Sequence, residues 1–324
     1  MAGVLVFGDV QNGDLQAASF EAVSAGLMMG NLLGAEVIGA LVGAELTNAA
    51  EAFSGSGISR LLVVDDAQLA SYTSEAFVCS AATIIQELKP QLVILPHTAN
   101  THESASRLAA RIGAGLVTNC SAVDLVEGEV VASRAICGGA VQAVYGFKHD
   151  LKIITLAVGV YEPANAGAPV SVEKAAIGPI NNPVEVLETI ADDNGDGPSL
   201  RTAKVVVSGG IGIGSAENWS IIEKAAKDLG AAVGATRAAV EMGWAQTSKQ
   251  VGFSGLKVGA DLYIAAGISG AIHHLAGIAR VKNVVAINSD AEANIFSVAR
   301  FGVVGDAKVV LPAFVARVNE LRNK

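Results

Sequence analysis

The stretch DLYIAAGISGAIHHLAGI, residues 261–278, decides how the second half of this chain folds. It opens with a short apolar run that is typical of a buried strand, turns at residues 267–270, and continues into a segment that we expect to be helical. An apolar strand that leads straight into a helix indicates a parallel sheet covered on both faces. His273 and His274 follow the turn, close to the strand end at which such sheets bind ligands.

The same alternation of strand and helix extends through the rest of the C-terminal part. Small or polar residues follow four apolar runs, at 208–214, 265–274, 287–290 and 304–306. A helix that begins at such a strand end offers free backbone N–H groups, and glycine lets an anion approach them closely. The turn SGGIGIG at 208–214 matches neither the dinucleotide-binding GxGxxG spacing nor the P-loop, so nucleotide binding and plain packing both remain open for it. We expect strands at 203–210, 261–267, 283–290 and 303–306, and helices at 215–234, 269–278, 294–302 and 310–324.

The N-terminal part shows a similar pattern. Continuous apolar runs separated by helical segments again predict a parallel sheet, here followed by a β-rich region. We expect strands at 4–8, 36–43, 60–65 and 91–96, helices at 15–35, 71–89 and 102–114, and further strands within 127–161.

A polar cluster, ETIADDNGDGPSLRTA at 188–203, separates the two parts and is typical of a linker. The sequence therefore predicts an α/β protein with two domains, 1–190 and 203–324, joined by a linker at 191–202. Each domain is expected to be a mainly parallel sheet flanked by helices.

Charge and composition limit the functions that the chain could have. The net charge of −9 disfavours nucleic acid as a partner. Residues up to Ile190 carry 8 Lys/Arg against 19 Asp/Glu, a balance of −11, whereas the remainder carries 14 against 12, a balance of +2. The C-terminal part is thus better suited to hold a small anion.

Targeting and metal signals are weak. The N-terminus has no basic residue ahead of its apolar run, which disfavours a secretory signal, and the uncharged window 262–279 contains glycines and histidines that disfavour membrane insertion. We therefore expect a cytoplasmic protein. Cys79, Cys120 and Cys137 are odd in number and lack CxxC spacing, so we expect three small buried hydrophobes rather than disulfides or a metal site.

No arrangement in the sequence predicts a catalytic residue. His273 and His274 point about 100° apart on a helix, so one is expected in the core and the other at the surface, unless a ligand uses one of them. Arg237, in GATRAAVEMGW at 234–244, needs an anionic or aromatic partner, which a salt bridge or a ligand could supply. Ser254, in QVGFSG at 250–255, could be a simple turn residue.

Taken together, VVVSGG, GATRAAVEMGW, QVGFSG, DLYIAAGISGAIHHLAGI, VVAINSD and FGVVGD resemble the alpha subunit of electron transfer flavoproteins in order and spacing. The resemblance implies a Rossmann-like C-terminal domain that binds FAD, in a cleft completed by a separate beta subunit. It implies an N-terminal domain with a nucleotide-hydrolase-like fold that contacts the beta subunit. By the same resemblance, Arg237 would lie against the flavin ring, Ser254 would bond its N5, and His274 would approach its O2. The cofactor-binding residues that it implies are Ile211, Thr236, Arg237, Val251, Gly252, Phe253, Ser254, Ser269, Gly270, Ala271, Ile272, His273, His274, Asn288, Asp306 and Ala307.

Arg237 would set the flavin potential rather than act as an acid or base. Reduction places negative charge near N1 and O2 of the flavin. At ~4 Å and an effective dielectric constant of ~20, one charge pair contributes about 4 kcal/mol, or roughly 0.2 V for one electron.

Three positions depart from the family pattern. Ile211 stands where the family usually has Arg, Phe253 replaces the usual Gln, and Ser254 replaces the usual Thr. The Ser keeps the hydroxyl, but Ile211 removes a positive charge. We therefore hypothesise weaker FAD binding or a differently tuned cofactor.

The resemblance implies an electron carrier without substrate turnover of its own. It would receive electrons from flavin dehydrogenases such as the acyl-CoA dehydrogenases of fatty acid β-oxidation, and would pass them to a quinone oxidoreductase or another redox acceptor. Two alternatives stay open. The chain could be the dedicated electron-transfer subunit of an acyl-CoA dehydrogenase or reductase complex, or a nucleotide-binding module whose FAD site is impaired.

Overall fold

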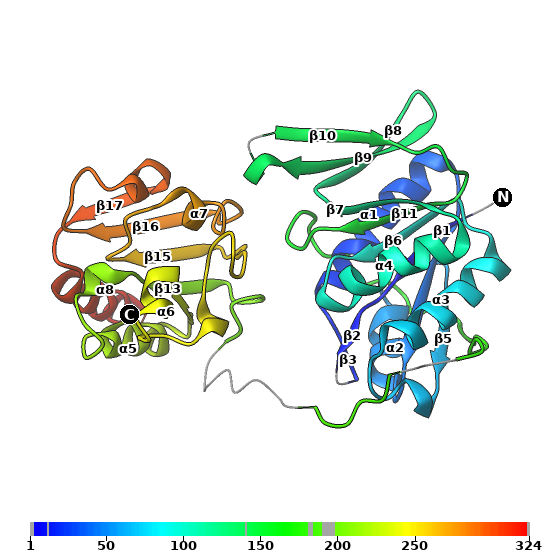
Figure 1. Ribbon diagram of the computed structural model, residues 1–324, viewed down its shortest axis with the longest axis horizontal. Coiled ribbons are helices and arrows are strands. Elements are labelled where there is room, and N and C mark those ends of the chain that lie inside the picture. Colours follow the sequence, from blue (N-terminus) through cyan, green and yellow to red (C-terminus); the bar gives the residue numbers. More distant parts are fainter. Residues whose placement is uncertain (1–2, 12, 140, 181–183, 190–197, 323–324) are drawn as a thin grey trace. The chain divides into compact units, whose positions relative to one another are not determined.

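The computed structural model describes residues 3–11, 13–139, 141–180, 184–189 and 198–322. The chain divides into two compact units, Met1–Thr189 and Ile190–Lys324 (Figure 1). Residues 191–197 of the expected linker lie outside the described residues. The end of that expected linker is part of the second unit, because Leu200 is buried in the second unit's core.

The first unit is built on a seven-stranded sheet in the order β12-β5-β4-β1-β6-β11-β7, and all of its described pairings are parallel. Along β1, Val4 and Val6 face one hydrophobic core, while Leu5 and Phe7 face the other. Both faces of the sheet are therefore covered, which explains why these strands are apolar throughout. The strands are β1 Val4–Phe7, β4 Val37–Gly43, β5 Arg60–Asp65, β6 Leu92–Pro96, β7 Gly115–Cys120, β11 Lys152–Leu156 and β12 Val172–Lys174.

Helices cover this sheet, and an antiparallel sheet follows it along the chain. The three expected helices are confirmed, and the sequence reading missed α2. The helices are α1 Ala18–Leu33, α2 Thr47–Ser54, α3 Ser74–Leu88 and α4 Ala99–Ile112. The antiparallel sheet has the order β10-β9-β8, with β8 Ala122–Val126, β9 Glu129–Ile136 and β10 Val141–Gly146. A short antiparallel pair, β2 Val10–Gln11 and β3 Asp14–Leu15, completes the strands of this unit.

The second unit is a five-stranded parallel sheet in the order β14-β13-β15-β16-β17. Figure 1 shows α5 and α8 together on one face of it. Two predicted mainly parallel α/β units are thus confirmed, and the second is Rossmann-like. The elements are β13 Val205–Gly209, α5 Trp219–Leu229, β14 Ala232–Ala235, α6 Arg237–Glu241, β15 Leu262–Ala266, α7 Ile272–Leu275, β16 Asn283–Asn288, β17 Phe301–Val304 and α8 Ala307–Arg322.

Three helix predictions in this unit were wrong in extent. The helix expected at 215–234 ends at Leu229, because Gly230 takes the left-handed conformation at its end, and the edge strand β14 follows. The helix expected at 269–278 is a single turn, Ile272–Leu275. The one expected at 294–302 is a short 3₁₀ segment, Asn294–Val298, ahead of β17.

Parallel pairing places the carboxyl ends of β13, β15, β16 and β17 along one edge of the second sheet. The four polar strand ends that the sequence singled out therefore lie at the same edge, as expected for a ligand site.

The cysteines correct another expectation. Cys79 and Cys120 are buried but Cys137 is exposed. Burial raises the pKa of the Cys120 thiol to about 12.

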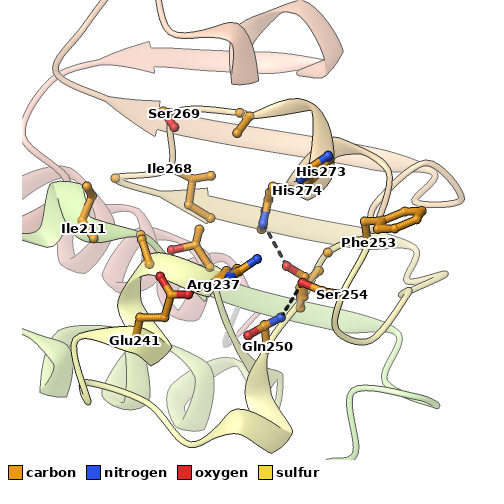
Figure 2. Close-up of a pocket in the computed structure, with 18 residues that line it drawn as sticks. Ile211, Arg237, Glu241, Gln250, Phe253, Ser254, Ile268, Ser269, His273 and His274 are labelled. Carbon is orange, nitrogen blue, oxygen red and sulfur yellow. Dashed lines mark hydrogen bonds and ion pairs between the residues drawn. The ribbon is translucent and has the colours of Figure 1, made fainter. Parts of the chain in front are cut away.

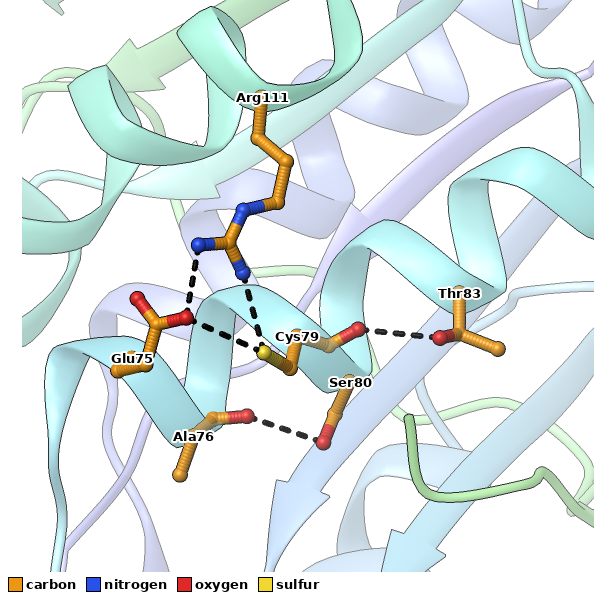
Figure 3. Close-up of polar contacts among 6 residues, drawn as sticks. All are labelled: Glu75, Ala76, Cys79, Ser80, Thr83 and Arg111. Atoms are coloured by element: carbon orange, nitrogen blue, oxygen red, sulfur yellow. Dashed lines mark hydrogen bonds and ion pairs between the residues drawn. The ribbon is translucent and has the colours of Figure 1, made fainter. Parts of the chain in front are cut away.

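Cys79 and Glu75 on α3 connect this helix to Arg111 on α4. Arg111 donates one hydrogen bond to Cys79 Sγ at 3.0 Å and another to Glu75 Oε1 at 2.7 Å (Figure 3). The bond from Arg111 lowers the pKa of the Glu75 carboxyl.

The described part of the chain contains neither a candidate membrane span nor a candidate metal cluster. No helix there is both long enough and apolar enough to cross a bilayer. No group of three or more His, Cys, Asp or Glu residues there could hold a metal ion.

Candidate functional site

A cavity of about 280 Å³ opens at the carboxyl edge of the second sheet (Figure 2). It lies where β13 and β15 end, between α6, the loop at 250–254 and the turn that leads into α7. Twelve of the sixteen predicted cofactor-binding residues line it: Ile211, Thr236, Arg237, Val251, Gly252, Phe253, Ser254, Ser269, Gly270, Ala271, His273 and His274.

Six residues that the prediction missed also line the cavity. Gly210 and Gly267 belong to glycine-rich turns that the sequence had already singled out. Glu241 and Gln250 could have been found from spacing, because each stands four residues from a predicted site residue, Arg237 and Ser254 respectively. The six are Gly210, Ala238, Glu241, Gln250, Gly267 and Ile268.

Four predicted residues do not line this cavity. Ile272 is 81% exposed and lies outside it. Asn288 uses its side-chain Nδ2 to donate to Ile268 O at 2.8 Å, which holds the loop after β15. Asp306 Oδ1 accepts from Lys308 N at 2.9 Å at the start of α8, where Ala307 is buried.

The glycines of the site serve backbone packing. Gly270 has φ +81°, and a side-chain carbon there would collide with the backbone of Ile295. A side-chain carbon on Gly277 would lie 2.5 Å from the Cα of Gly252. The backbone around Gly270 therefore tolerates no larger residue even without a ligand.

The cation of the site is paired within the protein. Arg237 Nε lies 2.7 Å from Glu241 Oε1, one turn along α6. Their side chains are 67% and 59% exposed. Water screens the pair and each side chain can turn away at little cost, so Arg237 is available to an incoming anion.

Two further polar side chains line the cavity on the loop at 250–254. Gln250 is buried and donates from Nε2 to Ser254 Oγ at 3.0 Å. The Ser254 hydroxyl keeps its own proton for another acceptor. Phe253 is exposed, and its ring centroid lies 5.7 Å from that of His273.

The two histidines lie as expected in the absence of a ligand, one at the surface and one in the core. His273 is exposed, and His274 is 6% exposed with both ring nitrogens engaged. His274 Nδ1 lies 3.1 Å from Val251 O, and Nε2 lies 3.1 Å from the Tyr263 hydroxyl. Both histidines also line the cavity.

The turn into α7 is suited to an anion. Among the described residues, none accepts a hydrogen bond from the backbone N–H groups of Gly270, Ala271, Ile272 or His273. The first bond of this turn runs from His274 N to Ala271 O. Unpaired N–H groups ahead of a helical turn are donors that phosphates use.

Comparisons with known proteins agree with this geometry. Residues 4–181 match the electron transfer flavoprotein domain, and residues 199–279 match the electron transfer flavoprotein FAD-binding domain. The chain is 36% identical over 325 residues to Protein FixB of Clostridium saccharobutylicum, covering 98% of this chain and 97% of that protein. It is 37% identical to the electron transfer flavoprotein subunit alpha of Syntrophomonas wolfei, covering 89% and 91%, and 40% identical to that of Mycobacterium leprae, covering 86% and 87%.

The donors that line the cavity suit the chemistry of the cofactor that this family binds. FAD carries a pyrophosphate, for which the free N–H groups of Gly270, Ala271 and His273 are suitable donors, and a flavin ring with acceptors for a guanidinium and a hydroxyl such as those of Arg237 and Ser254. From its matched domains, its relatives and this site, the chain belongs to the alpha-subunit family of electron transfer flavoproteins, and its second unit is the FAD-binding domain.

Proposed function

We propose that this chain carries electrons from flavin dehydrogenases to a redox acceptor, with FAD held at the carboxyl edge of its second sheet. The observation that carries the proposal is that one cavity is lined by a cation, a hydroxyl and three residues with free backbone N–H groups, Gly270, Ala271 and His273. Among the described lining residues, the Ser254 hydroxyl bonds to Gln250 and the Thr236 hydroxyl to Ala239 N, so neither is paired with a base that would activate it.

The turn at 269–273 would hold the pyrophosphate through its backbone donors. Arg237, Ser254 and His274 would lie at the flavin ring. A cavity of about 280 Å³ encloses only part of a dinucleotide. The remainder would extend along the sheet edge towards Asn288 and Asp306, whose side chains already fix the adjoining loops.

Bound FAD supplies the redox centre that takes up and releases electrons. Arg237 would compensate the negative charge that reduction adds to the ring, at the expense of its bond to Glu241. Ser254 would donate its hydroxyl proton to a ring acceptor, because Gln250 already occupies a lone pair on Ser254 Oγ. Neither residue would transfer a proton to a substrate.

We further propose that a beta-type subunit completes the cleft and that an acyl-CoA dehydrogenase is one electron donor. The test is anaerobic reduction of the purified heterodimer by a substrate-reduced acyl-CoA dehydrogenase, followed by oxidation with a quinone oxidoreductase. Fast turnover with freely dissociating partners is the expected result. Reduction only by a dehydrogenase that co-purifies at fixed stoichiometry would instead identify a dedicated subunit of one complex.

A further inference from the structure

Among the residues that the structure describes, Gln250 alone hydrogen-bonds the side chain of Ser254. Its Nε2 donates to Ser254 Oγ at 3.0 Å, and both residues line the cavity (Figure 2). Gln250 is only 9% exposed, whereas Ser254 is exposed. An exposed serine hydroxyl can rotate among its staggered positions, so a buried partner decides which of them it prefers.

The loop that carries Gln250 holds its side chain in place. The backbone O of Gln250 accepts from Leu256 N at 2.7 Å, and its backbone N donates to Thr247 O at 3.0 Å. A side-chain carbon at Gly255 would collide with Gln250 O and would lie 3.0 Å from Gln250 Cγ. Gly255 does not have a positive φ, so it is the small size of Gly255 that makes room for Gln250. The loop therefore fixes the amide through contacts within this chain.

The direction of the hydrogen bond determines what Ser254 offers to the cavity. An amide Nε2 can only donate, so Ser254 Oγ accepts from it and the hydroxyl proton stays free for a third group. An acceptor in place of Nε2 would take up that proton and leave only lone pairs towards the cavity. Gln250 thus makes Ser254 a donor to a ligand.

We propose that Gln250 is a positioning residue that holds the Ser254 hydroxyl as a donor to an acceptor atom of the flavin ring. The bond between Gln250 and Ser254 is a property of this chain, whereas its consequence for FAD rests on the proposed function. Gln250 acts through Ser254 and carries no charge, so its effect is distinct from that of Arg237. Removal of the amide should therefore matter only while the Ser254 hydroxyl is present.

Substitutions at the two positions separate this role from a general contribution of the loop to folding. Gln250→Met keeps the length of the side chain and removes its hydrogen bonding, and Ser254→Ala removes the hydroxyl. Gln250→Leu repeats the first change with an apolar side chain of different shape. Gln246→Met is the matched control, because Gln246 is exposed outside the cavity on the same segment.

The first measurement is the Kd for FAD of the intact heterodimer, obtained by adding FAD back to the flavin-depleted complex. We expect Ser254→Ala to weaken binding about tenfold and Gln250→Met about fivefold, since each variant loses the benefit of a hydrogen bond. The double variant should bind no more weakly than Ser254→Ala alone. A roughly fiftyfold loss in the double variant would show that the two residues act independently, and would overturn the proposal.

The second measurement is the visible absorption spectrum of the bound oxidised flavin, which responds to hydrogen bonds at the ring. Gln250→Met and Gln250→Leu should shift the bands in the same direction as Ser254→Ala, and Gln246→Met should leave them unchanged. If Ser254→Ala shifts the bands but both Gln250 variants keep the wild-type Kd and spectrum, the positioning role is refuted and the proposed function stands. An FAD-loaded Ser254→Ala complex with unchanged Kd and spectrum would instead refute the placement of the flavin ring at Ser254.

Discussion

Arg237 and Glu241 form an ion pair at the wall of the cavity in the second unit, with Nε 2.7 Å from Oε1. In the proposed site, Glu241 would therefore oppose the positive charge that a bound flavin experiences. Because both side chains are largely exposed, the pair stabilises α6 by only about 0.3–0.5 kcal/mol. Its more important effect is on the electrostatic potential at the cavity.

Glu241→Gln should raise the flavin midpoint potential, because it removes a negative charge beside the cavity and leaves the fold intact. In a water-like dielectric the effect is about 1 kcal/mol at most, which corresponds to tens of millivolts for one electron. A redox titration of the heterodimer measures it. Asp228→Asn is the control, since it breaks the matching pair with Lys224 on α5, away from the cavity. Equal potentials in Glu241→Gln and wild type would show that the pair does not influence the flavin.

Ile211→Arg should tighten FAD binding. Ile211 is 54% exposed at the cavity wall, so an arginine fits without burial and can form a charge-assisted bond to a phosphate. We expect a Kd lower by roughly tenfold, with stronger dependence on salt. Ile211→Gln separates charge from size. Equal affinities for the arginine variant and wild type would refute the hypothesis that Ile211 weakens the site.

Gly270→Ala should destabilise the second unit strongly. Gly230→Ala should cost only about 1 kcal/mol, because Gly230 shares a positive φ but has open space around it. Gly270 adds the collision with Ile295, so its substitution should cost roughly 3 kcal/mol or more. Tryptophan fluorescence during urea unfolding measures both, since the chain's two tryptophans, Trp219 and Trp244, lie in this unit. Similar losses of unfolding free energy in the two variants would mean that the loop around Gly270 shifts to accommodate the added methyl group.

His274 should make the second unit less stable in acid. The unfolded chain takes up a proton at a pKa of 6.5, whereas the folded ring does so only at about 4. The free energy of unfolding therefore falls as the pH drops from about 6.5 to 4, by roughly 3 kcal/mol, and His274 adds no pH dependence above that window. Urea unfolding at several pH values, followed by tryptophan fluorescence, measures this. His274→Gln should lose this part of the acid sensitivity, and an unchanged profile would show that the ring is not held neutral.

Sequence patterns predicted the two parallel sheets because strands buried on both faces, such as Val4–Phe7, must be apolar throughout. They failed at α7, where the run 269–278 has helical character but packs as one turn. The backbone contacts of Gly270 with Ile295, and of Gly277 with Gly252, join segments that are distant in sequence and decide this local structure. Glu241 and Gln250 lie within the quoted motifs, but the resemblance assigns them no role, so only their spacing from Arg237 and Ser254 could have indicated them.

The most direct test of the account is the flavin content of the heterodimer when the cavity is blocked. Ala271 is exposed and lines the cavity, whereas the neighbouring Ile272 is exposed outside it. We predict that Ala271→Trp purifies with one FAD fewer per alpha chain than wild type, and that Ile272→Trp retains the full complement. A folded Ala271→Trp complex with as much FAD as wild type would contradict the placement of the cofactor in this cavity.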